Sequence, residues 1–279
     1  MDFRGTNALI TGGGSGIGLG CARHLLRDGA TVTLMGRTEQ RLRDAADSLR
    51  AAAPDDVEVR WSAGDVTDED AVRKAVAVAD EGDGLGIVVA SAGVGWVEPI
   101  PRIPVAAWRN VLEVNLTGTF LTMKHAVPRM ARRGGGAFTA ISSVAGQLSI
   151  PYLSPYNVAK AGVDAFVRSA ADELGKAGIR VNSVLPGIVP TDLATHEFED
   201  DEIVRRYLEN MPVRRVGTVE DVAAAVRFLS GPEASWITGV LLPVDGGHHL
   251  RRGDVFEPYV AREFGPEWLT DEGYRIFGD

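Results

Sequence analysis

The sequence predicts a single α/β domain in which a doubly wound parallel sheet of about seven strands carries helices on both faces. Seven short apolar runs rich in β-formers recur along the 279 residues and alternate with longer segments of helical period. Parallel strands are expected to be continuously apolar, because helices cover both faces of their sheet. No linker rich in Pro, Gly or Ser divides the chain, so one domain is favoured over two.

The predicted strands come in an order that alternates with predicted helices. The strands are Ala8–Ile10, Thr31–Met35, Val57–Trp61, Ile87–Ala90, Ala137–Ile141, Val181–Leu185 and Val240–Leu242. Apolar stripes of helical spacing lie between the early strands, at Leu42, Ala45, Ala46 and Leu49 and again at Val72, Ala75, Val76 and Ala79. Repeated strand–helix–strand units are typical of a doubly wound sheet.

Composition argues against several classes of protein. Hydrophobic residues make up 45% and charged residues 24%, and the mean hydropathy is −0.01, as in ordinary globular chains. The formal net charge of −9 argues against a general nucleic-acid binder, which needs a basic surface. No segment approaches the roughly 20 apolar residues of a membrane span. Residues Met1 to Asn7 have neither the basic region nor the apolar run of a signal peptide, so we expect a cytoplasmic protein.

Cysteine and histidine usage predicts no metal site. Cys21 is the one cysteine, so it has no thiol partner for a disulfide or a metal. The five histidines show no ligand spacing beyond the adjacent pair His248-His249, and adjacent residues do not usually face one centre.

A glycine-rich turn follows the first predicted strand and leads into a helical pattern. Its sequence is Thr11-Gly12-Gly13-Gly14-Ser15-Gly16-Ile17-Gly18. Glycines at a strand-to-helix turn let the backbone approach a pyrophosphate, while the free amides and the positive helix end hold the anion. We therefore predict a Rossmann-type dinucleotide site; the alternative, a flexible N-terminal turn, is disfavoured by the strand before and the helix after.

The end of the second strand bears on the choice of cofactor. An acidic residue at this position binds the ribose 2′-hydroxyl of NAD and repels a 2′-phosphate. This chain has Gly36 there, followed by Arg37. The lack of a carboxylate at this position, together with the guanidinium of the next residue, favours NADP(H), with NAD(H) possible. The alternative is that Arg37 is only a solvated residue at a helix start.

Tyr156 and Lys160 lie four residues apart in a predicted helix, so they share one face. A phenol with an ordinary pKa near ~10 is a poor base at neutral pH, and a neighbouring ammonium lowers that pKa by favouring the phenolate. A serine hydroxyl from Ser142-Ser143, at the end of the fifth strand, can then hydrogen-bond a substrate oxygen. Taken alone the pair is a weak signal, because any surface helix can carry it.

Between Asn7 and Gly247 the sequence resembles the short-chain dehydrogenase/reductase family, in its 3-oxoacyl reductase-like branch. The matching segments are Thr11-Gly12…Gly16-Ile17-Gly18, Asp65-Val66, Ala92-Gly93, Asn115-Leu116-Thr117-Gly118-Thr119, Ser142-Ser143, Tyr156…Lys160, Pro186-Gly187 and Val244-Asp245-Gly246-Gly247. The resemblance implies an NAD(P)-dependent oxidoreductase that interconverts a secondary alcohol and a ketone, with a 3-oxoacyl, steroid-like or other hydrophobic carbonyl as substrate.

The resemblance also implies a catalytic tetrad of Asn115, Ser143, Tyr156 and Lys160. Tyr156 transfers the proton, Lys160 lowers its pKa and holds the nicotinamide ribose, and Asn115 holds a water that links Lys160 to solvent. Ser143 matches the family's usual distance from the tyrosine, so Ser142 is expected to be structural. Asn115 has an alternative or additional role as a helix-kink residue.

Cofactor contacts are implied along the ends of several strands. Asp65 matches the acid that contacts adenine, although a capping aspartate is the alternative, and residues after the sixth strand match those that hold the nicotinamide carboxamide. The full predicted set is Gly12, Gly14, Ser15, Gly16, Ile17, Gly18, Arg37, Asp65, Val66, Ala92, Gly93, Tyr156, Lys160, Pro186, Gly187, Val189 and Thr191. The family's Asn-Asn-Ala-Gly is Ala90-Ser91-Ala92-Gly93 here, which puts one sheet-stabilising hydrogen bond in doubt.

The substrate is expected beyond the carboxyl ends of the strands. Loop residues there predict an apolar pocket, formed by Trp96, Gln147, Leu148, Tyr152, Leu193 and His196. The acidic stretch 191–213 falls outside the strand–helix rhythm and resembles the family's substrate lid. Its carboxylates, including Glu199 and Asp200, are expected to disfavour a strongly anionic substrate at the rim; the alternative is a solvated surface insertion.

Residues 1–250 are predicted to form the domain, and 251–279 a C-terminal extension that packs on it or on a neighbouring subunit. The extension has little periodicity but six aromatics, Phe256, Tyr259, Phe264, Trp268, Tyr274 and Phe277, which favour docking over a loosely packed tail. The resemblance further implies a homo-oligomer, a tetramer or a dimer, with Asp245-Gly246-Gly247 near an interface.

Two other functions compete with the enzyme. A protein that only senses nicotinamide nucleotides has no need for the intact set Ser143, Tyr156 and Lys160. A sugar-nucleotide epimerase or dehydratase is disfavoured by the spacing of the glycines and by the lack of a large substrate domain. The expected partner is a small alcohol or carbonyl compound.

Overall fold

The computed structural model describes residues 1–53, 57–251, 256–270 and 275. Seven parallel strands form one sheet in the order β3-β2-β1-β4-β5-β6-β7. The strands are β1 (Asn7–Thr11), β2 (Thr31–Gly36), β3 (Val59–Ala63), β4 (Leu85–Ala90), β5 (Gly136–Ile141), β6 (Ile179–Pro186) and β7 (Leu241–Val244). This confirms the predicted doubly wound sheet, with shifts of a few residues at the strand ends.

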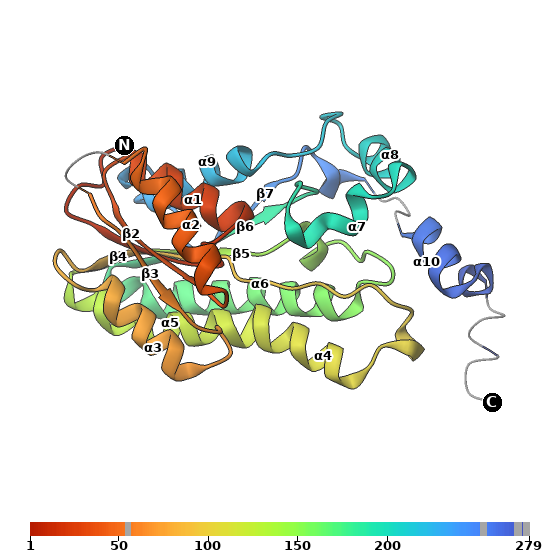
Figure 1. Cartoon of the computed structure of the whole chain (residues 1–279), viewed down its shortest axis with the longest axis horizontal. Helices are drawn as coiled ribbons and strands as arrows, with labels where there is room; N and C mark the ends of the chain where they lie inside the picture. The colour runs from red at the N-terminus through yellow and green to blue at the C-terminus, as the bar shows by residue number, and fades with distance from the viewer. Residues whose placement is uncertain (54–56, 252–255, 271–274, 276–279) are drawn as a thin grey trace.

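Helices cover both faces of the sheet (Figure 1). The helices are α1 (Gly16–Arg27), α2 (Glu39–Arg50), α3 (Glu69–Ala79), α4 (Val105–Leu112), α5 (Gly118–Arg132), α6 (Ser154–Leu174), α7 (Thr195–Phe198), α8 (Asp201–Asn210), α9 (Val219–Ser230) and α10 (Glu257–Phe264). A π-helical turn, η2 (Glu113–Thr117), joins α4 to α5. Within the described chain no helix has the length and apolar content that a membrane crossing requires.

The sheet separates two apolar cores. One core packs α1, α2 and α9 against the sheet through residues such as Leu25, Leu42 and Val222. The other packs α3, α5 and α6 on the opposite face, with Val72 and Val163 among its members. The buried residues of α2 and α3 are the two predicted stripes, because a 3.6-residue period puts these positions on one side of each helix.

The strand order places a binding crevice at one edge of the sheet. The chain winds outward through β1, β2 and β3, then returns past β1 to build the other half from β4. Loops from the two halves therefore separate at the carboxyl ends of β1 and β4, and ligands of open α/β sheets bind at such a point. Thr11 ties these two ends together, because its Oγ1 accepts hydrogen bonds from the backbone amides of Ser91 (3.1 Å) and Ala92 (3.2 Å).

A third apolar cluster lies outside the two cores and joins residues 191–213 to the C-terminal segment. Ile203 and Tyr207 of α8 pack in it with Phe256, and Ile150 and Leu153 come from the loop before α6. Figure 1 shows α10 beside α8 at one end of the molecule. The C-terminal segment thus packs on α8 of its own chain.

Candidate active site

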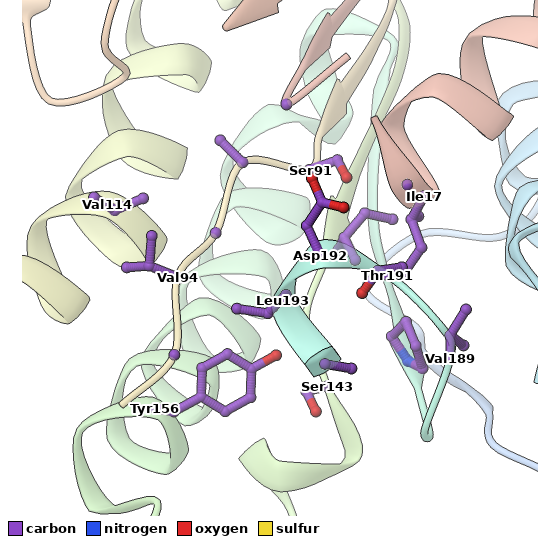
Figure 2. Close-up of a pocket in the computed structure, with 18 of the residues that line it drawn as sticks. Ile17, Ser91, Val94, Val114, Ser143, Tyr156, Val189, Thr191, Asp192 and Leu193 are labelled. Atoms are coloured by element: carbon purple, nitrogen blue, oxygen red, sulfur yellow. The ribbon is translucent and has the colours of Figure 1, made fainter. Parts of the chain in front are cut away.

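A cavity of about 960 Å³ opens at the carboxyl ends of the strands. Every residue of the predicted cofactor set lines it, as do Ser143, Tyr156 and Lys160 of the predicted tetrad. Figure 2 shows Tyr156, Ser143 and Leu193 around one part of this cavity, with Ile17 and Thr191 farther along it. Segments that are distant in the sequence thus contribute to one continuous site.

The glycine turn is built by close backbone contacts. A Cβ on Gly18 would lie 2.3 Å from the carbonyl oxygen of Gly12, and one on Gly12 would come within 3.0 Å of the Ala92 backbone. Gly12 also has a φ of +65°. Ser15 is the N-cap of α1, and its side chain makes no capping hydrogen bond. The first amides of α1 therefore remain available to an anion beside the cavity.

Arginines lie at the end of the cavity next to β2. Arg37 is exposed and has no hydrogen bond or ion pair with the residues that the structure describes. Arg41 of α2 pairs with Asp192, which follows β6, at 2.7 Å, so this contact crosses the cavity mouth. Asp65 accepts hydrogen bonds from the backbone amide and the hydroxyl of Thr67, both at 2.9 Å. Sequence reasoning missed Arg41, which lies four residues after Arg37 in the first turn of α2.

Tyr156 and Lys160 project from the first turns of α6. Lys160 Nζ donates a hydrogen bond to the carbonyl oxygen of Ile141 (2.8 Å) and lies 5.4 Å from the centre of the Tyr156 ring. Ser143 Oγ accepts a hydrogen bond from the Ala145 amide at 3.1 Å. Ser142 also lines the cavity, but its Oγ is buried and donates to the Lys160 carbonyl oxygen at 3.3 Å.

Asn115 lies behind the cavity wall in the π-helical turn η2, so the expected irregularity in the helix is present. Its Nδ2 donates hydrogen bonds to the carbonyl oxygens of Val94 and Val111, both at 2.8 Å. Its Oδ1 is buried and accepts no hydrogen bond from the described residues. A Cβ on Gly93 would lie 2.9 Å from this oxygen and 3.7 Å from Lys160 Nζ, so Gly93 leaves room between the two polar groups.

Burial lowers the pKa of Lys160 to about 8, from an ordinary 10.5. Between pH 8 and 10.5 Lys160 carries its proton in the unfolded chain but not in the folded protein. The contribution of Lys160 to the free energy of unfolding therefore increases as the pH rises through this range. Below pH 8 the folded protein buries an ammonium group, at a cost of up to about 3 kcal/mol.

We expect Lys160→Met to remove this pH dependence. The stability of coenzyme-free wild type relative to the variant should rise by about 3 kcal/mol between pH 8 and 10.5. Loss of the hydrogen bond to Ile141 adds a constant difference that does not vary with pH. Urea unfolding of both proteins at several pH values measures this, and a difference that is flat across the range would contradict the prediction.

The substrate end of the cavity differs in part from the predicted pocket. Trp96 and Leu193 line it as predicted, whereas Gln147, Leu148 and Tyr152 do not. Tyr152 has a φ of +67°, and its hydroxyl donates to the Trp268 carbonyl oxygen at 3.4 Å, so this side chain turns toward the C-terminal segment. The side chain of His196 lies outside the described residues. Sequence reasoning missed several lining residues, namely Ile150, Leu153, Tyr207, Tyr259 and Phe264.

The acidic stretch within residues 191–213 is paired with arginines rather than simply solvated. Asp200 caps α8 by accepting from the amides of Glu202 and Ile203, and it also forms an ion pair with Arg262 at 2.6 Å. Glu202 pairs with arginines of the next turn, at 2.6 and 2.9 Å. The negative field expected at the rim is therefore partly compensated, which sequence spacing alone did not reveal.

Comparisons with known proteins agree with this arrangement. The family model described as enoyl-(acyl carrier protein) reductase matches residues 12–249. Cis-4-hydroxycyclohexanecarboxylate dehydrogenase of Sinomonas cyclohexanicum is 39% identical over 243 residues, which cover 86% of this chain and 95% of that protein. The 3-oxoacyl-(acyl-carrier-protein) reductase of Aquifex aeolicus is 34% identical over 248 residues, 88% of this chain and 98% of that protein.

A solved structure is similar over nearly the whole chain. The short-chain type dehydrogenase/reductase from Mycobacterium ulcerans superposes with a TM-score of 0.93 at 39% identity. The match covers 96% of this chain and 98% of that one.

Proposed function

We propose a specific reaction from the premise that the chain belongs to the short-chain dehydrogenase/reductase family, whose members are NAD(P)-dependent oxidoreductases of CH–OH groups. In this proposal the protein interconverts a hydrophobic secondary alcohol and its ketone, and Tyr156 transfers the proton. The observation that carries the proposal is the convergence of Tyr156, Lys160 and Ser143 on the cavity that the glycine turn also lines. The names of two relatives, a hydroxycyclohexanecarboxylate dehydrogenase and a 3-oxoacyl reductase, support a secondary alcohol and its ketone.

The residues present fit a nicotinamide dinucleotide. The turn at Gly12 and Gly18 is so tight that a Cβ would fill it, and it ends at an uncapped helix N-terminus suited to a pyrophosphate. Arg37 and Asp65 would hold the adenosine half, and Lys160 with the loop from Pro186 to Thr191 the nicotinamide half. When bound, the coenzyme supplies or accepts the hydride.

The chain's own groups handle the proton and the oxygen. In reduction Tyr156 donates its phenolic proton to the carbonyl oxygen, and in oxidation it accepts the proton of the alcohol. The Ser143 hydroxyl donates a hydrogen bond to the same oxygen and steadies its developing charge. Lys160 is mainly protonated at pH 7, and its ammonium near the Tyr156 ring favours the phenolate. The buried Oδ1 of Asn115 suits a water that returns a proton to Lys160.

Rates with purified protein test the proposal. A panel of cyclic ketones, a steroid ketone and a 3-oxoacyl thioester is offered with NADPH and with NADH, and loss of reduced coenzyme is followed by absorbance. Turnover of at least one ketone is the expected result. Binding of neither coenzyme, or binding with no turnover of any panel member, would overturn the proposal and favour a nucleotide sensor.

We expect Arg37→Ala to separate the two coenzymes. A guanidinium bonded to the 2′-phosphate of NADP contributes about 1.5–3 kcal/mol, so the affinity for NADPH should fall by roughly tenfold or more, with NADH within about twofold. Fluorescence titration with each coenzyme measures this. Arg43→Ala is the matched control, because Arg43 lies nearby on α2 but pairs with Glu39 at 2.6 Å and stacks over Trp61. An equal loss of affinity for both coenzymes would show that Arg37 does not bind the 2′-phosphate.

The assembly and the lid belong to the same proposal. A homo-oligomer, tetramer or dimer, is supported by apolar side chains left exposed on α5 and α6, such as Phe120 (45% exposed) and Val158 (46%). Residues 191–213 act as a substrate lid above the domain 1–250. The cytoplasmic location expected from the sequence stays a prediction.

A further inference from the structure

The C-terminal segment, residues 256–270, reaches the substrate end of the cavity although it follows the part of the chain that the family model matches. Tyr259 and Phe264, both half-buried on α10, line the cavity. Their rings are 6.0 Å apart in an edge-to-face arrangement. Tyr207 of α8 and Trp96 of the loop after β4 also line the cavity. The walls at this end therefore combine these four aromatic side chains with aliphatic ones such as Ile150 and Leu153.

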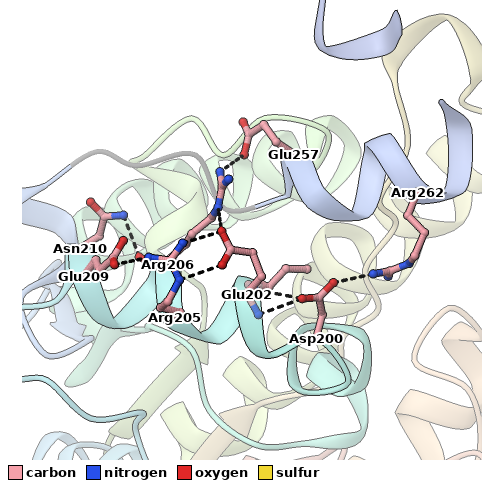
Figure 3. A network of polar contacts seen from close by, with 9 residues as sticks. Asp200, Glu202, Arg205, Arg206, Glu209, Asn210, Glu257 and Arg262 are labelled. Atoms are coloured by element: carbon pink, nitrogen blue, oxygen red, sulfur yellow. Dashed lines mark hydrogen bonds and ion pairs between the residues drawn. The ribbon is translucent and has the colours of Figure 1, made fainter. Parts of the chain in front are cut away.

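Ion pairs join α10 to the lid (Figure 3). Arg262 pairs with Asp200 at 2.6 Å, and Glu257 pairs with Arg206 at 3.3 Å. Both carboxylates are mostly buried, with side chains 12% and 20% exposed. Partly buried pairs of this kind are less screened than pairs in open solvent. They act together with Phe256 and Val260, which are buried, to hold α10 against the lid.

The same segment contacts the loops on the other side of the cavity. The Arg102 guanidinium lies 4.9 Å from the centre of the Phe264 ring and forms an ion pair with Glu98 at 3.5 Å. The Tyr152 hydroxyl donates to the carbonyl oxygen of Trp268. The C-terminal segment thus joins the lid, the loop after β4 and the loop before α6, which are three loops around the substrate end.

The charges of the lining are unfavourable to an anionic substrate. Among the described lining residues the cations are Arg37 and Arg41 beside β2, and Lys160 at the catalytic centre. The substrate end instead contains Glu98, which is already engaged by Arg102 and by Trp96 Nε1 at 2.8 Å. The two arginines nearest these aromatic rings are already paired, Arg102 with Glu98 and Arg262 with Asp200. A carboxylate placed among Tyr207, Tyr259 and Phe264 would therefore lose its hydration and have to compete for these cations.

We propose that the C-terminal segment is a specificity-determining wall of the active site, in which Tyr259 and Phe264 select a neutral substrate that carries an apolar ring. This inference rests on the proposed ketone reductase function. Aromatic faces favour a flat or ring-shaped apolar group through contact area and edge-to-face packing. The charge distribution adds discrimination against a carboxylated version of the same ring.

The test compares three ketones in the full-length protein. They are 4-methylcyclohexanone, its charged counterpart 4-oxocyclohexanecarboxylate, and 2-butanone, which has no ring. Wild type is expected to have its highest kcat/KM for 4-methylcyclohexanone. The double variant Tyr259→Ala, Phe264→Ala should lower that value by roughly tenfold or more, mainly through KM, because pocket contacts of one to a few methylenes are worth about this much. The value for 2-butanone and the coenzyme affinity should stay within about twofold.

Matched variants distinguish the effect of losing the aromatic wall from the effect of general damage to the fold. Leu269→Ala removes an exposed side chain of the same segment that is not among the lining residues, so it should change nothing. Phe264→Leu keeps apolar volume and should lose less than Phe264→Ala. Arg262→Glu places like charges at Asp200 and should raise KM for the ring ketone, whereas Arg73→Glu at a surface pair should not.

The outcomes are distinguishable. If the double variant lowers kcat/KM equally for the ring ketone and for 2-butanone, or for neither, the wall is overturned and the reductase function stands. If wild type prefers 4-oxocyclohexanecarboxylate to 4-methylcyclohexanone, selection for a neutral substrate is overturned. If wild type binds coenzyme but turns over no ketone, including the broader panel, the proposed function fails and this inference fails with it.

Discussion

Tyr156→Phe is expected to lower kcat by about 10²- to 10⁴-fold, the range typical of a general acid–base group. The substitution removes one hydroxyl and keeps the ring that lies beside Lys160, so the cavity shape and the coenzyme affinity should be preserved. Initial rates with the best ketone of the panel, together with fluorescence titration of the coenzyme, measure the two quantities separately.

Tyr152→Phe is the matched control for this experiment. Tyr152 lies four residues earlier, and its hydroxyl donates to Trp268 outside the cavity lining. Loss of that long hydrogen bond, 3.4 Å, should change kcat by no more than about twofold. If Tyr156→Phe retained more than about a tenth of the wild-type kcat, another group would have to transfer the proton.

The sheet and the two cores were predictable because their signals are local. A strand covered on both faces is mainly apolar, as in the fully buried β4 and the centre of β1, and a helix with one buried face must repeat its apolar residues every three or four positions. The residues that line the cofactor part of the cavity were predictable for a related reason. They follow strands whose carboxyl ends meet at one edge of the sheet.

The substrate end was less predictable because contacts between distant segments determine it. Nothing local indicates that Arg262 meets Asp200, 62 positions earlier, or that Arg41 meets Asp192 across the cavity. Tyr152 is an aromatic loop residue of the kind that lines apolar pockets, but its left-handed backbone conformation turns the side chain toward Trp268. Tyr274 and Phe277, also predicted to dock, lie outside the described residues. The aromatic content of the extension predicted that it packs on something, and the structure places Phe256 and α10 against α8 of the same chain.

Gly18→Ala is expected to weaken coenzyme binding by about 100-fold or more. The added Cβ would lie 2.3 Å from the carbonyl oxygen of Gly12 and 2.8 Å from its carbonyl carbon, and both are backbone atoms that no side-chain rotation can move away. The turn and the start of α1 must therefore separate, and a shift of about 1 Å is enough to cost about 100-fold in a positioned site.

Gly175→Ala provides the control for the loss of a glycine as such. A Cβ there meets nothing within 4 Å, and Gly175 has no positive φ, so coenzyme binding should be unchanged. Fluorescence titration with NADPH measures the affinities, and circular dichroism checks that both variants keep their helices. If Gly18→Ala bound NADPH with wild-type affinity, opening of the turn would not affect coenzyme binding. The pyrophosphate would then have to be bound elsewhere.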